Sequence, residues 1–320
     1  MKILLHISRF IVAATFIFSG FVKLVDPLGS TYKFQEYFGA DVLNLEFLIP
    51  YALPFSICLI LAEILLGVLL LVGYLPKLTV WSLLVMILVF LFLTWYSAYY
   101  EKVTDCGCFG DAIKLSPWGT FYKNIVLVLL IIVLVFNVKR IKPLMSLTFA
   151  KWASFLSFVV FLYIVYHVLV HLPIIDFRPY AIGKNIKEGM QYVGDKEPVV
   201  HDFFLESNDG EDMTNYVLEQ DKMLLVVAYN LSKSDTKSFS NIKSVTEQAL
   251  ENGYEVYALS SSLNEEFEAI KNEFKLNFDA LFCDETTLKT IIRANPGILT
   301  LQNGTVTGKW NWVDADKIKF

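Results

Sequence analysis

The chain has 320 residues, of which 55% are hydrophobic and 18% are charged, and its mean hydropathy is +0.50. These averages fit neither an ordinary soluble protein nor a pure membrane bundle, because they combine two different halves. Residues 1–175 carry 12 Lys or Arg and 8 Asp or Glu, whereas residues 176–320 carry 15 and 24. The acidic second half argues against nucleic acid or anionic lipid as its partner.

Five segments are apolar over the roughly 20 residues that a helix needs to cross a hydrocarbon core. The predicted spans are residues 4–22, 47–72, 78–99, 117–138 and 152–172. A cleaved signal peptide is the alternative for the first, but no small-residue cleavage pattern follows it. An odd number of spans places the two ends of the chain on opposite sides of the membrane.

Positive charge in the short loops sets the orientation of a membrane protein. The richer side holds Lys2, Arg9, Lys77, Lys139, Arg140, Lys142 and Lys151, and the other side holds Lys23, Lys33, Lys102 and Lys114. We therefore predict a multi-pass protein of a bacterial inner membrane. Its amino terminus is expected in the cytoplasm and its carboxy-terminal domain in the periplasm.

Two cysteines separated by one residue, Cys106 and Cys108, lie in the loop between the third and fourth predicted spans. This loop falls on the periplasmic side, where disulfides can persist. Two residues span at most about 7 Å, so the sulfurs can meet, but a disulfide across one residue should be strained and exchange-prone. The flanking Asp105 and Asp111 disfavour the thiolate form. This favours a pair that is normally oxidised or is attacked by a partner.

The second span holds two accessory candidates. Glu63 lies past the membrane midplane, where an ionisable side chain is costly and faces the bundle interior. It is either a proton or quinone partner or a structural carboxyl, protonated and hydrogen-bonded between helices. Cys58, five residues earlier, would be a third redox thiol only if the dithiol loop enters the bundle, since a buried cysteine usually behaves as a small hydrophobe.

The segments 9–27, 62–67 and 105–111 together resemble the DoxX/MauE-type membrane proteins. The resemblance covers residues 1–140. It implies a four-helix membrane bundle associated with thiol redox and with the maturation of periplasmic enzymes. Residues 141–175 would then add a fifth span that delivers the following domain outside.

After a predicted linker at residues 176–198, the remaining residues, 199–320, have the pattern of an α/β domain. A hairpin is expected around Asn208-Asp209-Gly210, between strands at 203–205 and 213–217. Strands are then predicted at 223–229, 254–259 and 280–283, alternating with helices at 235–251, 264–274 and 285–294. Two last strands, 298–301 and 306–310, are joined by Asn303-Gly304, a strong two-residue hairpin turn.

This order of elements resembles the thioredoxin fold, and Asn295 and Pro296 fall where that fold has its cis proline. The resemblance makes this pair the candidate partner-binding position. Residues 229–235, where a thioredoxin carries Cys-x-x-Cys, contain no cysteine. Cys283 is expected to be a packed hydrophobe. The domain is therefore not expected to run dithiol chemistry by itself.

The favoured hypothesis is a membrane component of periplasmic thiol–disulfide exchange or redox-linked protein maturation, a candidate thiol–disulfide oxidoreductase that uses Cys106 and Cys108. The expected partners are a periplasmic thioredoxin-like reductase or a client protein, together with the lipid bilayer. The alternative is a non-enzymatic scaffold or assembly factor whose thioredoxin-like domain binds peptides. No metal site and no cofactor are evident, and a quinone is a hypothesis without a motif. His167 and His171 share a helix face, but two ligands do not make a metal site.

Overall fold

The computed structural model describes residues 2–103, 107–194, 197–235, 237–262 and 264–320. Cys106 and Asp105 lie outside these ranges. The chain divides into two compact units, Met1–Leu169 and Val170–Phe320, and each is described by itself. The division falls a few residues before the predicted linker, which begins at residue 176.

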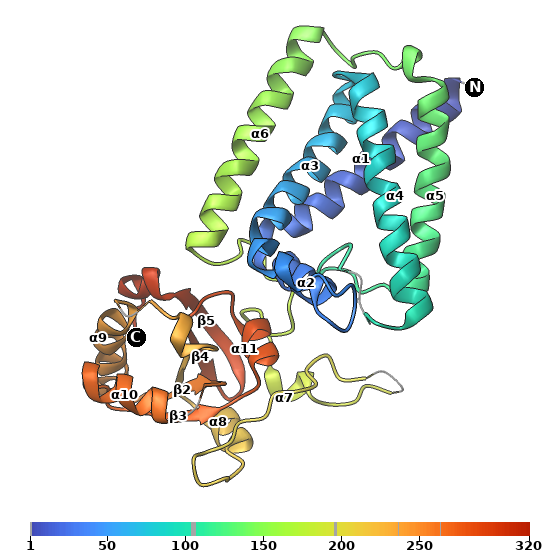
Figure 1. The fold of residues 1–320 in the computed structure, drawn as a ribbon. Helices are drawn as coiled ribbons and strands as arrows, with labels where there is room; N and C mark the ends of the chain where they lie inside the picture. The colour runs from blue at the N-terminus through green and yellow to red at the C-terminus, as the bar shows by residue number, and fades with distance from the viewer. Residues whose placement is uncertain (1, 104–106, 195–196, 236, 263) are drawn as a thin grey trace. The chain divides into compact units, whose positions relative to one another are not determined.

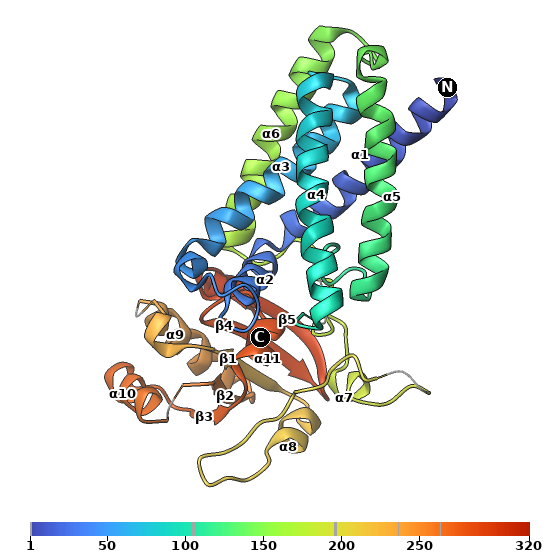
Figure 2. The same ribbon diagram turned by 45° about the vertical axis from the view of Figure 1, so that its right-hand side comes forward.

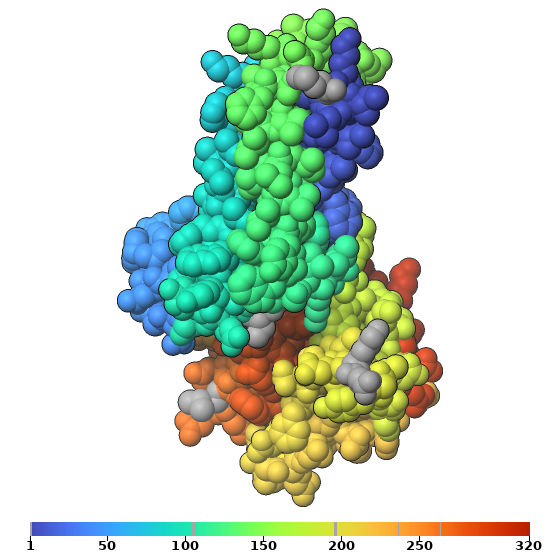
Figure 3. Space-filling model, turned by 90° about the vertical axis from the view of Figure 1, so that its right-hand side faces the viewer, coloured from blue at the N-terminus to red at the C-terminus, as the bar shows by residue number. Residues whose placement is uncertain are grey.

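Within its described residues, the first unit has five helices that are long and apolar enough to cross a membrane, as predicted. They are α1 (Lys2–Val25), α3 (Ala52–Val72, after a 3-10 turn at Glu46–Tyr51), α4 (Pro76–Tyr100), α5 (Pro117–Phe136) and α6 (Leu147–Val170). Helix α1 runs obliquely through the bundle, while α4 and α5 lie side by side (Figure 1). The view in Figure 2 agrees, and the side chains of α4 and α5 meet along their length in Figure 3. The chain is a multi-pass membrane protein.

A short helix that the span analysis missed, α2 (Pro27–Phe38), follows α1 directly. Asp26 caps its amino end by accepting a hydrogen bond from the Gly29 amide at 3.1 Å. Pro27 occupies the first turn, where its missing N–H costs nothing. This Asp-Pro pair is the local signal that could have predicted the helix.

Helices α1 and α3 cross at two glycines. A Cβ atom on Gly20 would lie 2.6 Å from the Ile64 Cβ, and one on Gly67 would lie 2.9 Å from the Ile17 amide nitrogen. No side chain larger than hydrogen fits at these distances. Glycine therefore allows the two backbones to approach closely, as is common between membrane helices.

Arg9 is not the loop charge that the sequence analysis counted. Its guanidinium is buried and donates from Nε to the Leu70 carbonyl at 2.8 Å and from Nη2 to the Leu71 carbonyl at 2.9 Å. These are among the last carbonyls of α3, which have no partner within the helix. Arg9 closes the carboxyl end of α3, where a cation is also favoured by the helix dipole.

The second unit is built on a five-stranded sheet with the order β3-β2-β1-β4-β5. Its strands are β1 (Met223–Val227), β2 (Glu255–Ser260), β3 (Asp279–Phe282), β4 (Gly297–Gln302) and β5 (Thr305–Asn311). Strands β1, β2 and β3 are parallel, and β4 runs antiparallel to both β1 and β5. Asn303 and Gly304 join β4 to β5 with positive φ angles of 48° and 75°, as this hairpin turn requires. The topology is thioredoxin-like, as predicted.

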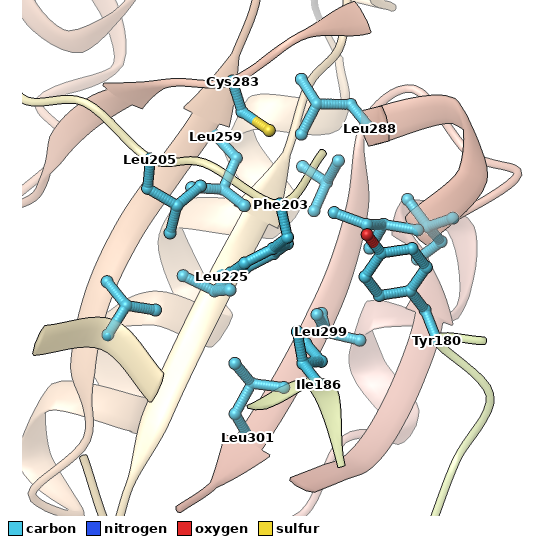
Figure 4. Packing of buried hydrophobic residues seen from close by; sticks show 14 of the residues in the cluster. Tyr180, Ile186, Phe203, Leu205, Leu225, Leu259, Cys283, Leu288, Leu299 and Leu301 are labelled. Carbon is cyan, nitrogen blue, oxygen red and sulfur yellow. The ribbon is translucent and has the colours of Figure 1, made fainter. Parts of the chain in front are cut away.

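Side chains of β1 alternate between two hydrophobic cores, one on each face of the sheet. Leu225 belongs to the cluster drawn in Figure 4, and Leu224 belongs to the opposite cluster, which α9 (Ser238–Glu251) covers. The remaining helices are α7 (Ile186–Gly189), α8 (Thr214–Glu219), α10 (Asn264–Phe274) and α11 (Glu285–Ile291). The α9 and α10 predictions are correct to within three residues.

Two predictions for this unit are wrong. Residues 214–217 lie in helix α8 rather than in the second strand of a hairpin. The turn at Gly210 is present, and Glu206 forms an isolated antiparallel β-bridge with Asp212. Residues 176–198 are not simply a linker. Tyr180 and Ile186 are buried in the core, and the Ile186 amide donates to the Gly304 carbonyl at 2.8 Å. Residues 183–186 line the outer edge of the sheet beside β5. The sequence of this segment has no periodicity that would indicate such packing.

A buried ion cluster fixes the start of this segment. The Asp176 carboxylate lies 2.7 Å from both the Arg178 Nε and the Lys309 Nζ. Burial opposes ionisation of Asp176, but Arg178 and Lys309 hold its pKa below the usual value. Burial, together with the Arg178 charge, lowers the pKa of Lys309 to about 8. The ion pairs thereby tie residues 176–178 to β5.

Candidate functional site at the dithiol loop

The described part of the dithiol loop lies against α1. The Cys108 carbonyl accepts a hydrogen bond from the Ser19 hydroxyl at 2.6 Å. The Phe109 ring packs on Phe18 with centroids 5.4 Å apart, and the Lys123 ammonium lies 4.3 Å from the centre of the same ring. The thiol-bearing backbone is therefore held on the bundle.

Glycines on both sides of Cys108 allow this close fit. Gly107 has a φ of +62°, and Gly110 has a φ of +49°. A Cβ on Gly110 would approach the Val22 Cγ1 to 2.9 Å, so the loop backbone packs directly on α1. The positive φ angles and the close packing of the loop on α1 therefore explain why glycines lie near Cys108 in the sequence.

A buried ion pair lies beneath the loop. The Lys23 Nζ lies 2.8 Å from the Glu63 Oε2, and the two side chains are 9% and 3% exposed. Lys23 also donates to the Ser19 hydroxyl at 2.9 Å. Continuous hydrogen bonds therefore run from the Cys108 carbonyl through Ser19 and Lys23 to Glu63.

This pair corrects two expectations. Lys23 was counted as a loop charge, but it lies in the last two turns of α1 and faces the bundle interior. Glu63 is hydrogen-bonded between helices, as the structural interpretation required, but its partner is a lysine. The sequence analysis missed Lys23 and Ser19, although both lie in the segment that carries the family resemblance.

Cys108 lines two cavities in this region. The larger, of about 70 Å³, is mostly apolar and includes Lys23, Lys33 and Thr94 in its lining. The smaller, of about 10 Å³, is lined by Ser19, Glu63 and Cys108, among others. The structure therefore brings two of the residues that were predicted from the sequence, Cys108 and Glu63, to one site.

Cys58 does not join them. The loop does pack on the bundle, but Cys58 is exposed on α3, whereas its neighbours Leu59 and Ile60 line the larger cavity. A helix turns 100° per residue, so the thiol and the cavity-lining side chains leave the helix in different directions. A role for Cys58 as a third redox thiol finds no support in this arrangement.

In the second unit the Asn295–Pro296 bond is cis, as predicted. The Asn295 side chain donates to the Asn230 carbonyl at 2.7 Å and accepts from the Asn230 amide at 3.3 Å. Asn230 lies in the segment where the thioredoxin resemblance expects its cysteines. The backbone at that position is thus engaged by an amide side chain.

Cys283 is a core residue rather than a reactive thiol. It is fully buried, and its sulfur points among Leu259 and Leu288 (Figure 4). Burial, with a contribution from Asp284, raises the pKa of the Cys283 thiol to about 12. It is therefore protonated at neutral pH.

The two histidines, His167 and His171, contact different residues. His171 lies beyond the end of α6, and its Nδ1 is 2.7 Å from the Asp314 carboxylate, whereas His167 stacks on Tyr163. Within the ranges that the structure describes, no three His, Cys, Asp or Glu side chains are grouped to hold a metal ion.

The fold and the site together define a class of protein, in which a multi-pass membrane bundle with a thiol loop is followed by a thioredoxin-like α/β domain. Residues 1–137 match the family model described as methylamine utilisation protein MauE, which confirms the MauE resemblance of the first 140 residues. No curated protein matches the chain.

One similar solved structure is a thioredoxin-like protein from Bacteroides caccae ATCC 43185, with 14% identity and a TM-score of 0.30 over 87% of each chain. The thioredoxin-like topology rests instead on the order and direction of the five strands.

Proposed function

We propose that this chain is a membrane component of thiol–disulfide exchange, in which Cys106 and Cys108 alternate between dithiol and disulfide. The match to the MauE model and the thioredoxin-like topology support a redox-related role at a membrane. The observation that carries the proposal is the setting of Cys108, which is partly accessible and lines two cavities beside a buried ion pair. A purely structural loop needs none of these features.

The exchange partner in this proposal is a protein disulfide or dithiol outside the cytoplasm. With a partner disulfide, one loop thiol forms a mixed disulfide and the second loop thiol resolves it. With a partner dithiol, one partner thiol opens the loop disulfide and the second partner thiol resolves the mixed disulfide. In both cases two electrons and two protons pass between the proteins. The thioredoxin-like domain holds the partner. A holding role suits a domain that lacks Cys-x-x-Cys and whose Cys283 is buried. A quinone as final electron acceptor stays a prediction.

The orientation also belongs to this proposal. Arg9 and Lys23 belong to α1 and have buried side chains, so they are removed from the count of loop charges. The remaining counted charges still differ, with six on the side of the amino terminus and three on the side of the dithiol loop. Basic loops stay in the cytoplasm. We therefore place the loop and residues 176–320 in the periplasm of a bacterial cell.

A second function is a non-enzymatic scaffold, in which the cysteines form a fixed staple and the second unit binds an extended partner near Pro296. The favouring observation is that the Asn295 amide closes onto Asn230, at the position where a redox domain would keep a nucleophile.

The redox state of the pair in native membranes separates the two functions. Acid quenching followed by a mass-shifting maleimide counts the free thiols, and a variant with both Cys106 and Cys108 replaced by Ser gives the background from Cys58 and Cys283. Exchange predicts a mixture that moves toward dithiol with added reductant. A fully oxidised pair that resists a mild reductant would favour the scaffold.

A further inference from the structure

Lys23 is a cation in an unusual position. It lies in a membrane-spanning helix, it is almost fully buried, and its hydrogen bonds to Ser19 and Glu63 measure 2.9 and 2.8 Å. Burying a charge is expensive, and replacing such a pair by apolar side chains is often neutral or stabilising. Stability alone is therefore a poor reason for the pair.

The ion pair lines the same two cavities as Cys108. Lys23 and Cys108 line the larger cavity, Glu63 and Cys108 line the smaller one, and Ser19 joins Lys23 to the Cys108 backbone. The other titratable groups that line these cavities are Lys33 and Tyr37 from α2 and Lys123 from α5, while α4 supplies uncharged side chains such as Thr94. Lys33 is held by Glu36 at 2.8 Å, and Lys123 lies over Phe109.

We propose that Lys23 is the cation that stabilises the Cys108 thiolate, and that Glu63 competes with this thiolate for the Lys23 charge. The inference rests on the proposed function and names the residues that control its reactive sulfur. Neither Lys23 nor Ser19 was a candidate from the sequence.

The proton balance of the step favours this arrangement. When the Cys108 thiol ionises, its proton passes to the Glu63 carboxylate, so that a neutral thiol beside an ion pair becomes a thiolate and a neutral acid beside the same ammonium. The net charge of the site does not change, which avoids the cost of creating charge in a poorly hydrated place. The smaller cavity, of about 10 Å³, is near the size that one bridging water needs.

The thiolate then attacks one sulfur of a partner disulfide. A Cys108–partner disulfide forms, the partner S–S bond breaks, and the second partner sulfur leaves with the bonding electrons and takes up a proton from water. In the reverse direction the same ammonium stabilises Cys108 as the leaving thiolate. Lys23 thus offsets the acidic residues that flank the cysteines in sequence.

The test uses the full chain in detergent with Cys106→Ser, so that Cys108 is the only thiol of the loop. Two rates are measured on the Cys108 peptide by mass spectrometry: alkylation by iodoacetamide between pH 5 and 10, and mixed-disulfide formation with oxidised glutathione at pH 7. The matched control is Ser56→Ala, because Ser56 is buried on α3 seven residues before Glu63 and its hydroxyl makes no hydrogen bond in the described structure.

Glu63→Gln frees the Lys23 charge for the thiolate. We expect the midpoint pH of alkylation, at which the rate is half its maximum, to fall by about one unit or more. The glutathione reaction at pH 7 should become several-fold faster. Adding Lys23→Met to Glu63→Gln removes both charges, keeps the volumes similar and avoids an unpaired buried carboxylate. We expect the midpoint of this double variant to rise by at least one unit above that of Glu63→Gln, with an at least tenfold slower reaction at pH 7.

The role of Lys23 would be overturned if the midpoint pH values of Glu63→Gln and the double variant differed by no more than those of the wild type and Ser56→Ala. Glu63 accepts the proton in the wild type, but water can accept it in Glu63→Gln. A slower glutathione reaction in this variant would therefore overturn the competition, because the loss of the proton acceptor would then outweigh the release of the Lys23 charge. Iodoacetamide needs no exchange partner, so these outcomes are read even if Cys108 never reacts with oxidised glutathione. Such inertness would count against the proposed function itself.

Discussion

The Lys23 ammonium and the Glu63 carboxylate meet at 2.8 Å across the crossing of α1 and α3, although 40 residues separate them in the chain. The contact forms because Gly20 lets the two helix backbones approach at Ile64, directly beside Glu63. Membrane packing therefore sets the electrostatics of the thiol loop.

The loop should be accessible from outside the cytoplasm. A membrane-impermeant maleimide applied to reduced, intact spheroplasts is expected to label Cys108 in a Cys58→Ser, Cys106→Ser variant, because the loop charges place this loop outside. Labelling is read from the Cys108 peptide, and Cys283 serves as the buried internal control. Modification that requires prior lysis would reverse the orientation.

Single replacement of either loop cysteine should trap a partner. Exchange passes through a mixed disulfide, and a lone cysteine lacks the thiol that resolves it. Cys106→Ser and Cys108→Ser are each expected to give a partner-linked band on a non-reducing gel. The double variant should give none. If neither single variant forms the band and the double variant supports growth like the wild type, the scaffold function gains.

Gly20→Val should open the crossing of α1 and α3. Its Cβ alone would lie 2.6 Å from the Ile64 Cβ, so the helices must separate, at a cost of about 1–3 kcal/mol for overpacking. Thermal unfolding in detergent is expected to show the loss. The control is Ala14→Val, which adds bulk at an exposed position of the same helix. Equal stability of the two variants would mean that the crossing tolerates a side chain.

Lys309 should make the second unit more stable as the pH rises from 8 to 10.5. Its pKa is about 8 when folded and 10.5 ordinarily, so between these values the unfolded chain binds more protons and unfolding becomes less favourable with pH. Lys309→Met should lack this rise.

The readout is the rate of Cys283 alkylation at urea concentrations that partly unfold the protein, because this thiol is buried until the second unit unfolds. Each rate is divided by that of the fully unfolded protein at the same pH. A difference between wild type and Lys309→Met that stays constant from pH 8 to 10.5 would contradict the lowered pKa.

Much of the architecture follows from local signals in the sequence. The membrane spans are long apolar runs, the start of α5 follows from the Ser116 cap and Pro117, and the β4–β5 turn follows from Asn303-Gly304. Each of these depends on a few neighbouring residues, whose conformational preferences act before any long-range contact forms. The cis bond at Pro296 was placed by the family resemblance rather than by such a signal.

Only the tertiary structure decided which charges are loop charges and which are buried partners. Arg9 and Lys23 carry the same local signature as a loop cation, yet one closes the end of α3 and the other pairs with Glu63. Likewise, the Ile186 segment has no periodicity but completes the sheet edge beside β5. Such partners come from distant segments, and packing selects them because a buried charge or backbone group must be satisfied wherever the fold places it.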